Sequence, residues 1–504
     1  MGEGDTTIPA GSTLTLNSGG CCNAILGENH SLTVGGQFDV VGASQLRFQE
    51  GAKLSNSGTI DFQADGSFVT EKWPGSTASV VNSGVLKREA GGGAESDIYP
   101  QFDNSGSVSV GAGSRLVFLE PNSSGGSDTG SYTATGSESS IAFDGGRSLG
   151  AGVSLTGTVE WLAGEVTGTI PAGSTLTLNS GGGCNAILGE NHSLTVGGTL
   201  GAINNSRLSL EKQATLTFKA SSVFKAGQGV GLNIPAGATL NSEGTQEHPV
   251  IFTAITDDTV GSHINHKAVV KPSAGEWSGI EIAGGATPLN TNLGYIEMRY
   301  ATTALALRGE GNVAVRGAFT NDPKAVEACN WGTSGCSVDA AYTYWGSSEG
   351  PFPSGGSPLT CGAVTTSPYR TSASSEATSN AKSAFAANCD SSPTPEERLA
   401  SAQASASAHI SSEEIRCGEG FKEACEVIEM YKKCLGAATQ LAAEQSPFTF
   451  SNGAQSVGSD GASWLEKSES VVVSSIGHVA SFGFQIIGVA NTILGIANAY
   501  NTCA

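Results

Sequence analysis

Short runs of alternating hydrophobic and polar residues, separated by glycine-containing turns, fill the chain from its start to about residue 365. Leu, Val and Ile supply most of the hydrophobic positions, and Thr or Ser supplies many of the positions between them. Alternation with a period of two is typical of a β-strand that has one buried face. We therefore expect strands at Ser12–Leu16, Ser31–Val34, Ser107–Val110, Thr175–Leu178 and Arg207–Leu210.

Sequence motifs recur in this region at a spacing of a little over twenty residues. Asn-Ser-Gly begins at Asn56, Asn82 and Asn104, and Ile-Pro-Ala-Gly begins at Ile170 and again at Ile234, 64 residues or about three such intervals later. Such recurrence, without helical periodicity between strands, predicts a parallel β-solenoid with two or three short strands in each coil. A coil length of ~22 residues would give ~16 coils, and turn asparagines would form hydrogen-bonded ladders. A string of β-sandwiches does not explain the recurrence.

A block of thirty residues occurs twice, from Thr7 to Gly36 and from Thr169 to Gly198, with one difference between the copies. Repetition of this kind favours a shared structural role for the repeated residues. We therefore expect His30 and His192 to have a structural role in the turns of the coils and not to belong to a catalytic site. The duplicated block divides the predicted solenoid into a first segment, residues 1–160, and a second segment, residues 161–365.

The pattern changes after residue 365. Residues 366–392 are rich in Ser and Ala and predict a linker. Residues 393–504 predict a small helical domain, because Thr394-Pro-Glu-Glu397 is a typical helix start and apolar residues follow at helical spacing. The expected fold is thus mainly β, a parallel β-solenoid followed by a small α-helical C-terminal domain.

The last helical segment, Ser470 to Tyr500, contains no Asp, Glu, Lys or Arg. It is long enough to span a bilayer, but Ser, Asn, Gln and His residues dilute its apolar character. Two interpretations stay open: a helix packed on its neighbours, and a segment that enters a membrane. Glycines would permit close packing in either case, and they are Gly477, Gly483, Gly488 and Gly495.

The amino-acid composition narrows the range of functions that the chain could have. The net charge of −21 disfavours nucleic-acid binding over most of the chain, and a hydrophobic content of 38% is too high for a disordered chain. The eleven cysteines form no CxxC pair and no zinc-like cluster, which favours disulfides and an extracellular or cell-surface location. The first residues do not form a signal peptide. The cysteines expected in disulfides are Cys329, Cys336, Cys361, Cys389, Cys417, Cys425 and Cys434.

Several stretches resemble known bacterial proteins. Residues 234–272, with Pro-Val-Ile-Phe-Thr and Asp-Asp, and Gly275-Glu-Trp-Ser-Gly-Ile-Glu-Ile282 resemble secreted right-handed β-helix proteins of the pectin-lyase type. Tyr344-Trp-Gly-Ser-Ser-Glu-Gly-Pro351 is similar to the terminal coils of that family, and Gly157 to Gly164 to repeats of adhesin-like surface proteins. The resemblance covers about residues 7–370 and implies that the solenoid is a right-handed parallel β-helix. It implies the fold more strongly than a function.

One group of titratable residues is a candidate metal-binding or catalytic site. Paired carboxylates could bind calcium or act as an acid and a base, and Asp257 and Asp258 are the candidate ligands. The alternative is that these two residues simply form a turn, and that Glu297 and Arg299 pair on one strand. The full candidate cluster is Asp257, Asp258, His263, His266, Lys267, Glu276 and Glu281. No catalytic residue is assigned, and calcium is the only cofactor considered.

Three functions stay open at this stage. The leading one is an extracellular or cell-surface structural protein, a stalk or an adhesin without catalytic activity in its solenoid, with a surface or glycan partner. The second is a polymorphic-toxin-like protein whose residues 393–504 are a membrane-acting effector through residues 470–500. The third, implied by the family resemblance, is a polysaccharide-binding or polysaccharide-degrading β-helix protein. An oligomeric state does not follow from the sequence.

Overall fold

The computed structural model describes residues 4–18, 24–71, 76–89, 95–119, 126–181, 186–264, 271–283, 291–328, 335–351, 359–361 and 363–372. The chain divides into two compact units, Met1–Cys389 and Asp390–Ala504. All described residues belong to the first unit. The predicted linker after residue 372 and the predicted helical domain, residues 393–504, lie outside the described residues.

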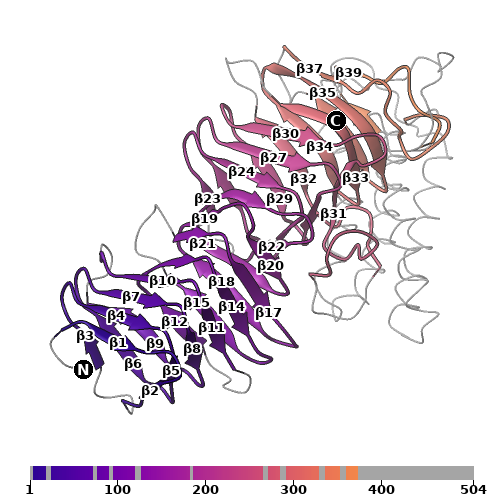
Figure 1. Cartoon of the computed structure of the whole chain (residues 1–504). Helices are drawn as coiled ribbons and strands as arrows, with labels where there is room; N and C mark the ends of the chain where they lie inside the picture. Colours follow the sequence, from indigo (N-terminus) through magenta and orange to yellow (C-terminus); the bar gives the residue numbers. More distant parts are fainter. Residues whose placement is uncertain are drawn as a thin grey trace, which may run out of the picture. The chain divides into compact units, whose positions relative to one another are not determined.

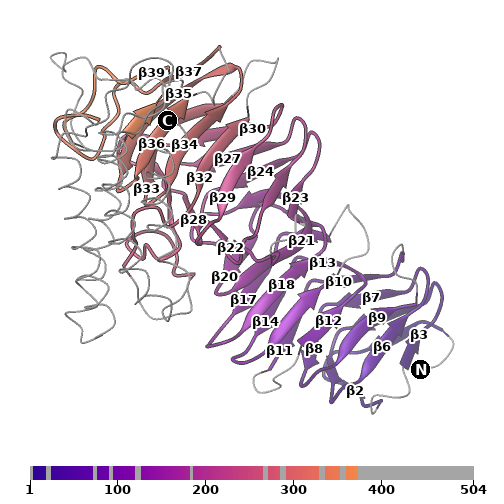
Figure 2. The same cartoon turned by 180° about the vertical axis from the view of Figure 1, so that it is seen from behind.

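The described part of the first unit is a parallel β-solenoid of about 13 turns and contains no helix. Each strand pairs with a strand of the next coil, so that successive coils stack in chain order (Figures 1 and 2). The predicted solenoid, with up to three short strands in each coil, is therefore confirmed. Strands stack in four rows, which we call the first to the fourth row.

The first row runs through the whole stack. It consists of β1 (Thr6–Ile8), β4 (Ser31–Val34), β7 (Lys53–Asn56), β10 (Ser79–Asn82), β13 (Gln101–Asn104), β16 (Gly126–Asp128), β19 (Arg147–Leu149), β21 (Val159–Ile170), β24 (Ser193–Val196), β27 (Thr215–Lys219), β30 (Thr239–Glu243), β33 (Asn292–Arg299), β35 (Gly311–Thr320), β37 (Cys336–Asp339) and β39 (Val364–Thr365).

The second row is a seven-stranded sheet confined to the first half of the stack. It consists of β2 (Thr13–Leu16), β5 (Gln37–Val40), β8 (Thr59–Phe62), β11 (Val85–Arg88), β14 (Ser107–Val110), β17 (Ser131–Ala134) and β20 (Ser154–Thr156).

The third row begins beside the second and continues past it. It consists of β3 (Ala24–Leu26), β6 (Gln45–Phe48), β9 (Ser67–Thr70), β12 (Glu95–Ile98), β15 (Arg115–Phe118), β18 (Ser140–Asp144), the first residues of β21, β22 (Thr175–Leu178), β25 (Thr199–Ala202), β28 (Val223–Ala226), β31 (Val250–Ala254) and the end of β33.

The fourth row replaces the second row in the later coils. It consists of β23 (Ala186–Leu188) and β26 (Leu208–Leu210), followed by the five-stranded sheet of β29 (Gly231–Ile234), β32 (Gly279–Ala283), β34 (Thr303–Arg308), β36 (Lys324–Ala328) and β38 (Leu359–Cys361).

The exchange of rows occurs at the long strand β21. Its residues Glu160 and Trp161 pair with β22, whereas its last residues pair with β24. The two copies of the duplicated block therefore form the same strands in different rows: β2 belongs to the second row and β22 to the third. The boundary predicted between residues 160 and 161 falls inside β21.

The coil length departs from the predicted value in places. Asn56 and Asn82 lie 26 residues apart and Asn82 and Asn104 lie 22 apart, in agreement with the motif spacing. A longer coil carries Asn241 of β30 opposite Asn292 of β33, because a long connection follows β31. This is one reason why the described coils number about 13 and not ~16.

Inward-facing Leu, Val, Ile and Phe side chains form one continuous core between the rows. Aromatic rings stack along it, with 4.9 Å between the ring centres of Phe62 and Phe68 and 4.6 Å between those of Phe102 and Phe118. Alternation therefore places the apolar set inside, as the sequence predicts. The turns that link strands expose most of the intervening polar residues.

The Asn-Ser-Gly motifs form the predicted ladder at the end of three first-row strands. The Asn56 amide donates to the Asn82 side chain (2.7 Å), and the Asn82 amide donates to the Asn104 side chain (2.8 Å). The glycine of each motif is also required by contact. A Cβ at Gly84 would lie 2.2 Å from the carbonyl oxygen of Gly58, so only glycine lets these coils approach.

A buried ion pair ends this ladder. Asp128 occupies the next position of the row, opposite Asn104, and its carboxylate binds the Arg147 guanidinium, with Nε 2.8 Å from Oδ2. Arg147 also donates to the Tyr132 hydroxyl (2.6 Å) and the Phe102 carbonyl (2.9 Å), and four aromatic rings surround it. These hydrogen bonds compensate for the cost of burying the charges.

Candidate functional site

Asp257 and Asp258 lie near the start of the long connection between β31 and β32. The backbone turns sharply there, because the Asp257 N–H donates to the Ala254 carbonyl (3.1 Å) and the Asp258 N–H to the Thr256 carbonyl (3.0 Å). Aspartate favours turns because its side chain accepts hydrogen bonds from the nearby backbone. The expected Asp257–Asp258 turn is confirmed. We call residues 255–264, which follow β31, the clasp loop.

Asp257 is fully buried, and each of its carboxylate oxygens has partners within the protein. Oδ1 accepts from the Thr259 hydroxyl (2.5 Å) and N–H (3.2 Å), while Oδ2 accepts from the Thr253 hydroxyl (2.7 Å) and from Arg299 (3.2 Å). Burial acts to raise the pKa of Asp257, but the hydrogen bonds from Thr259 and Thr253 and the charge of Arg299 lower it overall. Asp257 is thus an ionised structural carboxylate.

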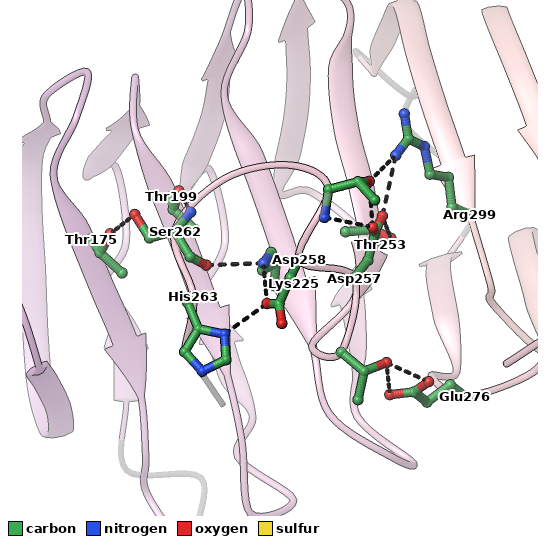
Figure 3. A network of polar contacts seen from close by, with 12 residues as sticks. Thr175, Thr199, Lys225, Thr253, Asp257, Asp258, Ser262, His263, Glu276 and Arg299 are labelled. Atoms are coloured by element: carbon green, nitrogen blue, oxygen red, sulfur yellow. Dashed lines mark hydrogen bonds and ion pairs between the residues drawn. The ribbon is translucent and has the colours of Figure 1, made fainter. Parts of the chain in front are cut away.

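Asp258 lies between two basic side chains (Figure 3). Its Oδ1 is 3.7 Å from the Lys225 ammonium, whose side chain is completely buried, and 2.9 Å from His263 Nδ1. Lys225 also donates to the Ser262 carbonyl (2.9 Å). Burial lowers the pKa of the Lys225 amine, and the nearby Asp258 and Asp257 carboxylates oppose this effect.

The clasp loop lies across the outer face of β22, β25 and β28. The Thr175 hydroxyl donates to the Ser262 hydroxyl (2.6 Å), and the Ser262 N–H donates to the Thr199 hydroxyl (3.3 Å), as Figure 3 illustrates. All four residues of each of these strands are consequently buried, on both faces. Gly201 makes room for the loop, because a Cβ there would lie 2.6 Å from Ile264.

The two glutamates of the predicted cluster lie in different places. Glu276 accepts a hydrogen bond from the Thr256 hydroxyl (2.7 Å) at the start of the clasp loop, and burial raises the pKa of its carboxyl. Glu281 lies on β32 in the fourth row and pairs with Arg308 (3.3 Å). In the described part of the chain, no contact joins Glu281 with Asp257 or Asp258. The predicted cluster is therefore only partly brought together.

Arg299 forms the predicted pair with Glu297, with Nε 2.9 Å from Oε1. This arginine belongs to β33 and also binds Asp257, so it connects the clasp loop to the next coil. Burial acts to lower the pKa of Arg299, while Glu297 and Asp257 raise it overall. The remaining members of the predicted cluster, His266 and Lys267, lie outside the described residues.

The hydrogen bonds and ion pairs of Asp257 and Asp258 hold the clasp loop in place. Within the described ranges, no three His, Cys, Asp or Glu side chains gather as a metal site. Calcium at Asp257 would have to replace the hydrogen bonds from Thr253 and Thr259 and approach the Arg299 cation. Calcium binding by Asp257 and Asp258 stays a prediction.

Most other predicted site residues fall outside the described residues. Cys336 is buried at the start of β37, and Cys361 belongs to β38, whereas Cys329, Cys389, Cys417, Cys425 and Cys434 are not described. The glycines of the last helical segment, Gly477, Gly483, Gly488 and Gly495, are not described either. In the part that is described, no helix has the length and apolar character needed to cross a membrane.

The structure adds a groove that the sequence analysis did not predict. It has a volume of about 610 Å³ and lies where β19, β21 and the turn before β24 meet on the outer surface. Glu165 in this groove accepts from the Gly189 N–H (2.6 Å) and lies 2.7 Å from His192 Nδ1. The His192 N–H donates to the Gly189 carbonyl (3.1 Å), the same turn contact that His30 makes with Gly27.

The duplication thus predicts the backbone role of His192 but not its side-chain partner. Lys225 was also missed, although a lysine inside the apolar run Val223–Ala226 is a sequence signal for a covered strand face. Comparison with models of protein families, with curated proteins and with solved structures found no match.

Proposed function

We propose that this chain is an extracellular or cell-surface structural protein whose right-handed β-solenoid serves as a stalk or display scaffold, without catalytic activity in the solenoid. One observation carries the proposal. The densest group of acids and bases, around Asp257 and Asp258, is used to fasten the clasp loop onto the strands of the third row. Its carboxylates have hydrogen-bonding or charged partners among the described residues.

The stacking of the coils supports a scaffold role. Backbone pairing continues from β1 to β39 in the first row, and the Asn56–Asn82–Asn104 ladder adds side-chain hydrogen bonds between coils. Repeats that contact only their neighbours can be lengthened by duplication without a change of fold. The duplicated thirty-residue block is consistent with such growth.

Polysaccharide cleavage is less favoured by the same contacts. Glycoside hydrolysis needs two carboxyl groups on either side of one bond. Asp257 is covered and paired with Arg299, while Glu281 belongs to another row and is paired with Arg308. These carboxylates therefore do not form the pair that an acid and a base would require.

Surface labelling of cells that produce the full chain tests the proposal. A membrane-impermeant biotin reagent should label the protein on intact cells. Peptide mapping without reduction should recover disulfide-linked peptides, because disulfides persist outside the reducing cytosol. The first expected pair is Cys329 with Cys336, which lie seven residues apart in the sequence. A protein found only in the cytosol with all cysteines reduced would contradict the proposal. Release of reducing sugar from a polysaccharide panel would also contradict it, if Asp258→Asn or Glu276→Gln abolished the release.

The effector alternative depends on residues 393–504, which are outside the described residues. Producing the full chain and a chain ending at residue 392 in the same cells separates the two functions. A structural protein should leave growth and membrane integrity unchanged in both cases. Leakage caused only by the full chain would favour the membrane-acting effector.

A further inference from the structure

The first coil of the described solenoid consists of β1, β2 and β3 and lies at one end of the stack (Figure 1). Each of these strands pairs on one side only, with β4, β5 and β6 of the next coil. In the part of the chain that the structure describes, no strand pairs with their other side. The backbone groups along that side form an open edge, which can accept another strand.

The duplicated block shows what this open edge lacks. Its second copy forms the same three strands, which are residues 168–170 of β21, β22 and β23. All three pair with a preceding coil, made of β19 and the earlier residues of β21, as well as with the following coil. The described structure thus contains one sequence twice, once with a preceding coil and once without.

The preceding coil also satisfies hydrogen-bonding groups between the strands of the second copy. The Ser174 hydroxyl accepts from the Leu155 N–H (3.0 Å). The Asn179 N–H donates to the Trp161 carbonyl (3.0 Å). The second copy is therefore bound at this surface by backbone donors and backbone acceptors of another coil.

The equivalent groups of the first copy are unoccupied. The counterparts are the Ser12 hydroxyl and the Asn17 N–H, and neither has a hydrogen-bonding partner in the described ranges. Apolar side chains differ in the same way: Leu14 is partly exposed and Ile25 is 43% exposed, whereas Leu176, the counterpart of Leu14, is fully buried. The surface that the second copy uses to contact a coil is therefore present and uncovered in the described part of the first copy.

The open edge carries no charge of its own. The strands β1, β2 and β3 contain no Asp, Glu, Lys or Arg, although the net charge of the chain is −21. Edge strands that stay unpaired are commonly protected by charged side chains, lysine above all. The acids that flank these strands are Asp5, which accepts from the Ser31 N–H (2.8 Å), and Glu28. An identical acidic chain can thus approach at the strands without direct repulsion between carboxylates.

We propose that this open end binds a second copy of the same chain, so that two solenoids join through their first coils. Contact between identical surfaces closes around a two-fold axis, and the association stops at a dimer. Strands related in this way run antiparallel, and antiparallel pairs are at least as stable as the parallel pairs between coils. The inference concerns assembly and does not depend on the extracellular location proposed above.

Sedimentation equilibrium of the full chain tests the proposal. The wild type should show a monomer–dimer equilibrium at micromolar concentrations. Ile25→Lys should raise the dimer dissociation constant about tenfold or more, because lysine on an edge strand opposes pairing. The matched control is Val81→Lys, which adds the same charge at a 37% exposed valine of β10, a strand with neighbours on both sides. This control should dimerise like the wild type.

Hydrogen exchange at a low and a high protein concentration locates the contact. The Asn17 amide should exchange more slowly at the concentration where the dimer forms. The Asn179 amide, at the same position of the second copy, should be protected at both concentrations. Peptides that begin before Thr7 and before Thr169 differ in mass, because residues 4–6 differ from residues 166–168. Mass spectrometry therefore distinguishes the two copies.

Three results would overturn the inference. The first is a full chain that stays monomeric at these concentrations, and the second is an Ile25→Lys variant that dimerises as tightly as Val81→Lys. The third is Asn17 exchange that does not respond to protein concentration. None of these results bears on the stalk or display role, which surface labelling tests separately.

Discussion

At the scale of single residues, the two partners of the ion pair beneath the clasp loop are buried to different extents. The Lys225 side chain is 0% exposed, whereas that of Asp258 is 27% exposed. A charge that loses its partner can be hydrated only if water reaches it. Loss of Asp258 should therefore destabilise the fold more than loss of Lys225.

We expect Asp258→Asn to lower the free energy of unfolding by about 3 kcal/mol, because it leaves the Lys225 ammonium buried without its carboxylate. Lys225→Met should cost about 1 kcal/mol, because water can still solvate Asp258. Urea unfolding measures both. The control is Lys219→Met, which breaks a 2.6 Å pair with Glu243 whose side chains are 49% and 50% exposed. That control should change stability little, and a larger loss for Lys225→Met than for Asp258→Asn would contradict the argument.

Asp97 on β12 makes a pH-dependent contribution to the free energy of unfolding. Burial, together with the neighbouring Glu95 carboxylate, raises its pKa from 3.8 to about 6, although Arg115 opposes the shift. The folded state therefore binds the proton more tightly than the unfolded state. The stability that Asp97 contributes is fully present below about pH 4 and is lost as the pH rises through about 6.

The variant Asp97→Asn should accordingly become more stable relative to the wild type as the pH rises from 4.5 to 7.5. The expected change in this difference is about 1 kcal/mol, because Asp97 is only half-buried and solvent screens its charge. Urea unfolding of both proteins at the two pH values measures it, and the comparison cancels all other titrating groups. A difference that is the same at both pH values would show that Asp97 titrates normally.

At the scale of elements, the Asn-Ser-Gly motif sets the ends of three first-row strands, β7, β10 and β13. Its asparagine joins the ladder inside the coil, and its glycine permits contact with the coil below. Identical strands can still have different surroundings. In β2, Thr13 and Thr15 are exposed, whereas Thr175 and Thr177 of β22 are buried by the clasp loop.

Removing the middle of the ladder should be costly. Asn82→Ala leaves the Asn56 amide and the Asn104 carbonyl oxygen without their partner, so we expect a loss of about 3 kcal/mol in the free energy of unfolding. Asn241→Ala is the matched control, because Asn241 lies in the same row but its side chain is outside the core. Urea unfolding compares the two, and an equal loss in both variants would argue against a stabilising ladder.

At the scale of the whole molecule, each coil of the described solenoid contacts mainly the coils on either side of it. Stability is then close to a sum of coil and interface terms, and damage in one coil need not spread. The buried Arg147–Asp128 pair and the Lys225–Asp258 pair lie in separate coils and should act independently.

Hydrogen exchange of Asn82→Ala tests this independence. Amide exchange should accelerate in β7, β10 and β13, which carry the ladder, and stay at wild-type rates in β27 and β30. Mass spectrometry of peptides from the full chain resolves these regions. An acceleration of similar size throughout residues 6–365 would mean that the solenoid unfolds as one cooperative unit.

The amino-acid sequence determined the fold of the described region because its information is local and repeated. Alternation gives strands, and in-register stacking of equivalent positions is predicted by motif spacing, as at Asn56 and Asn82. The Asp257–Asp258 turn and the Glu297–Arg299 pair were predictable for the same reason, since both depend on residues that are close in the chain.

The tertiary structure decided what depends on residues far apart. Thr175 and Ser262 are 87 residues apart in the sequence, and Arg147 and Phe102 are 45 residues apart. No local sequence pattern predicts contacts over such separations. The exchange of rows at β21, the burial of Lys225 and the pairing of Glu165 with His192 belong to this class. Alternation reports which side of a strand faces the core, but only the folded chain determines which loop, if any, covers the other side.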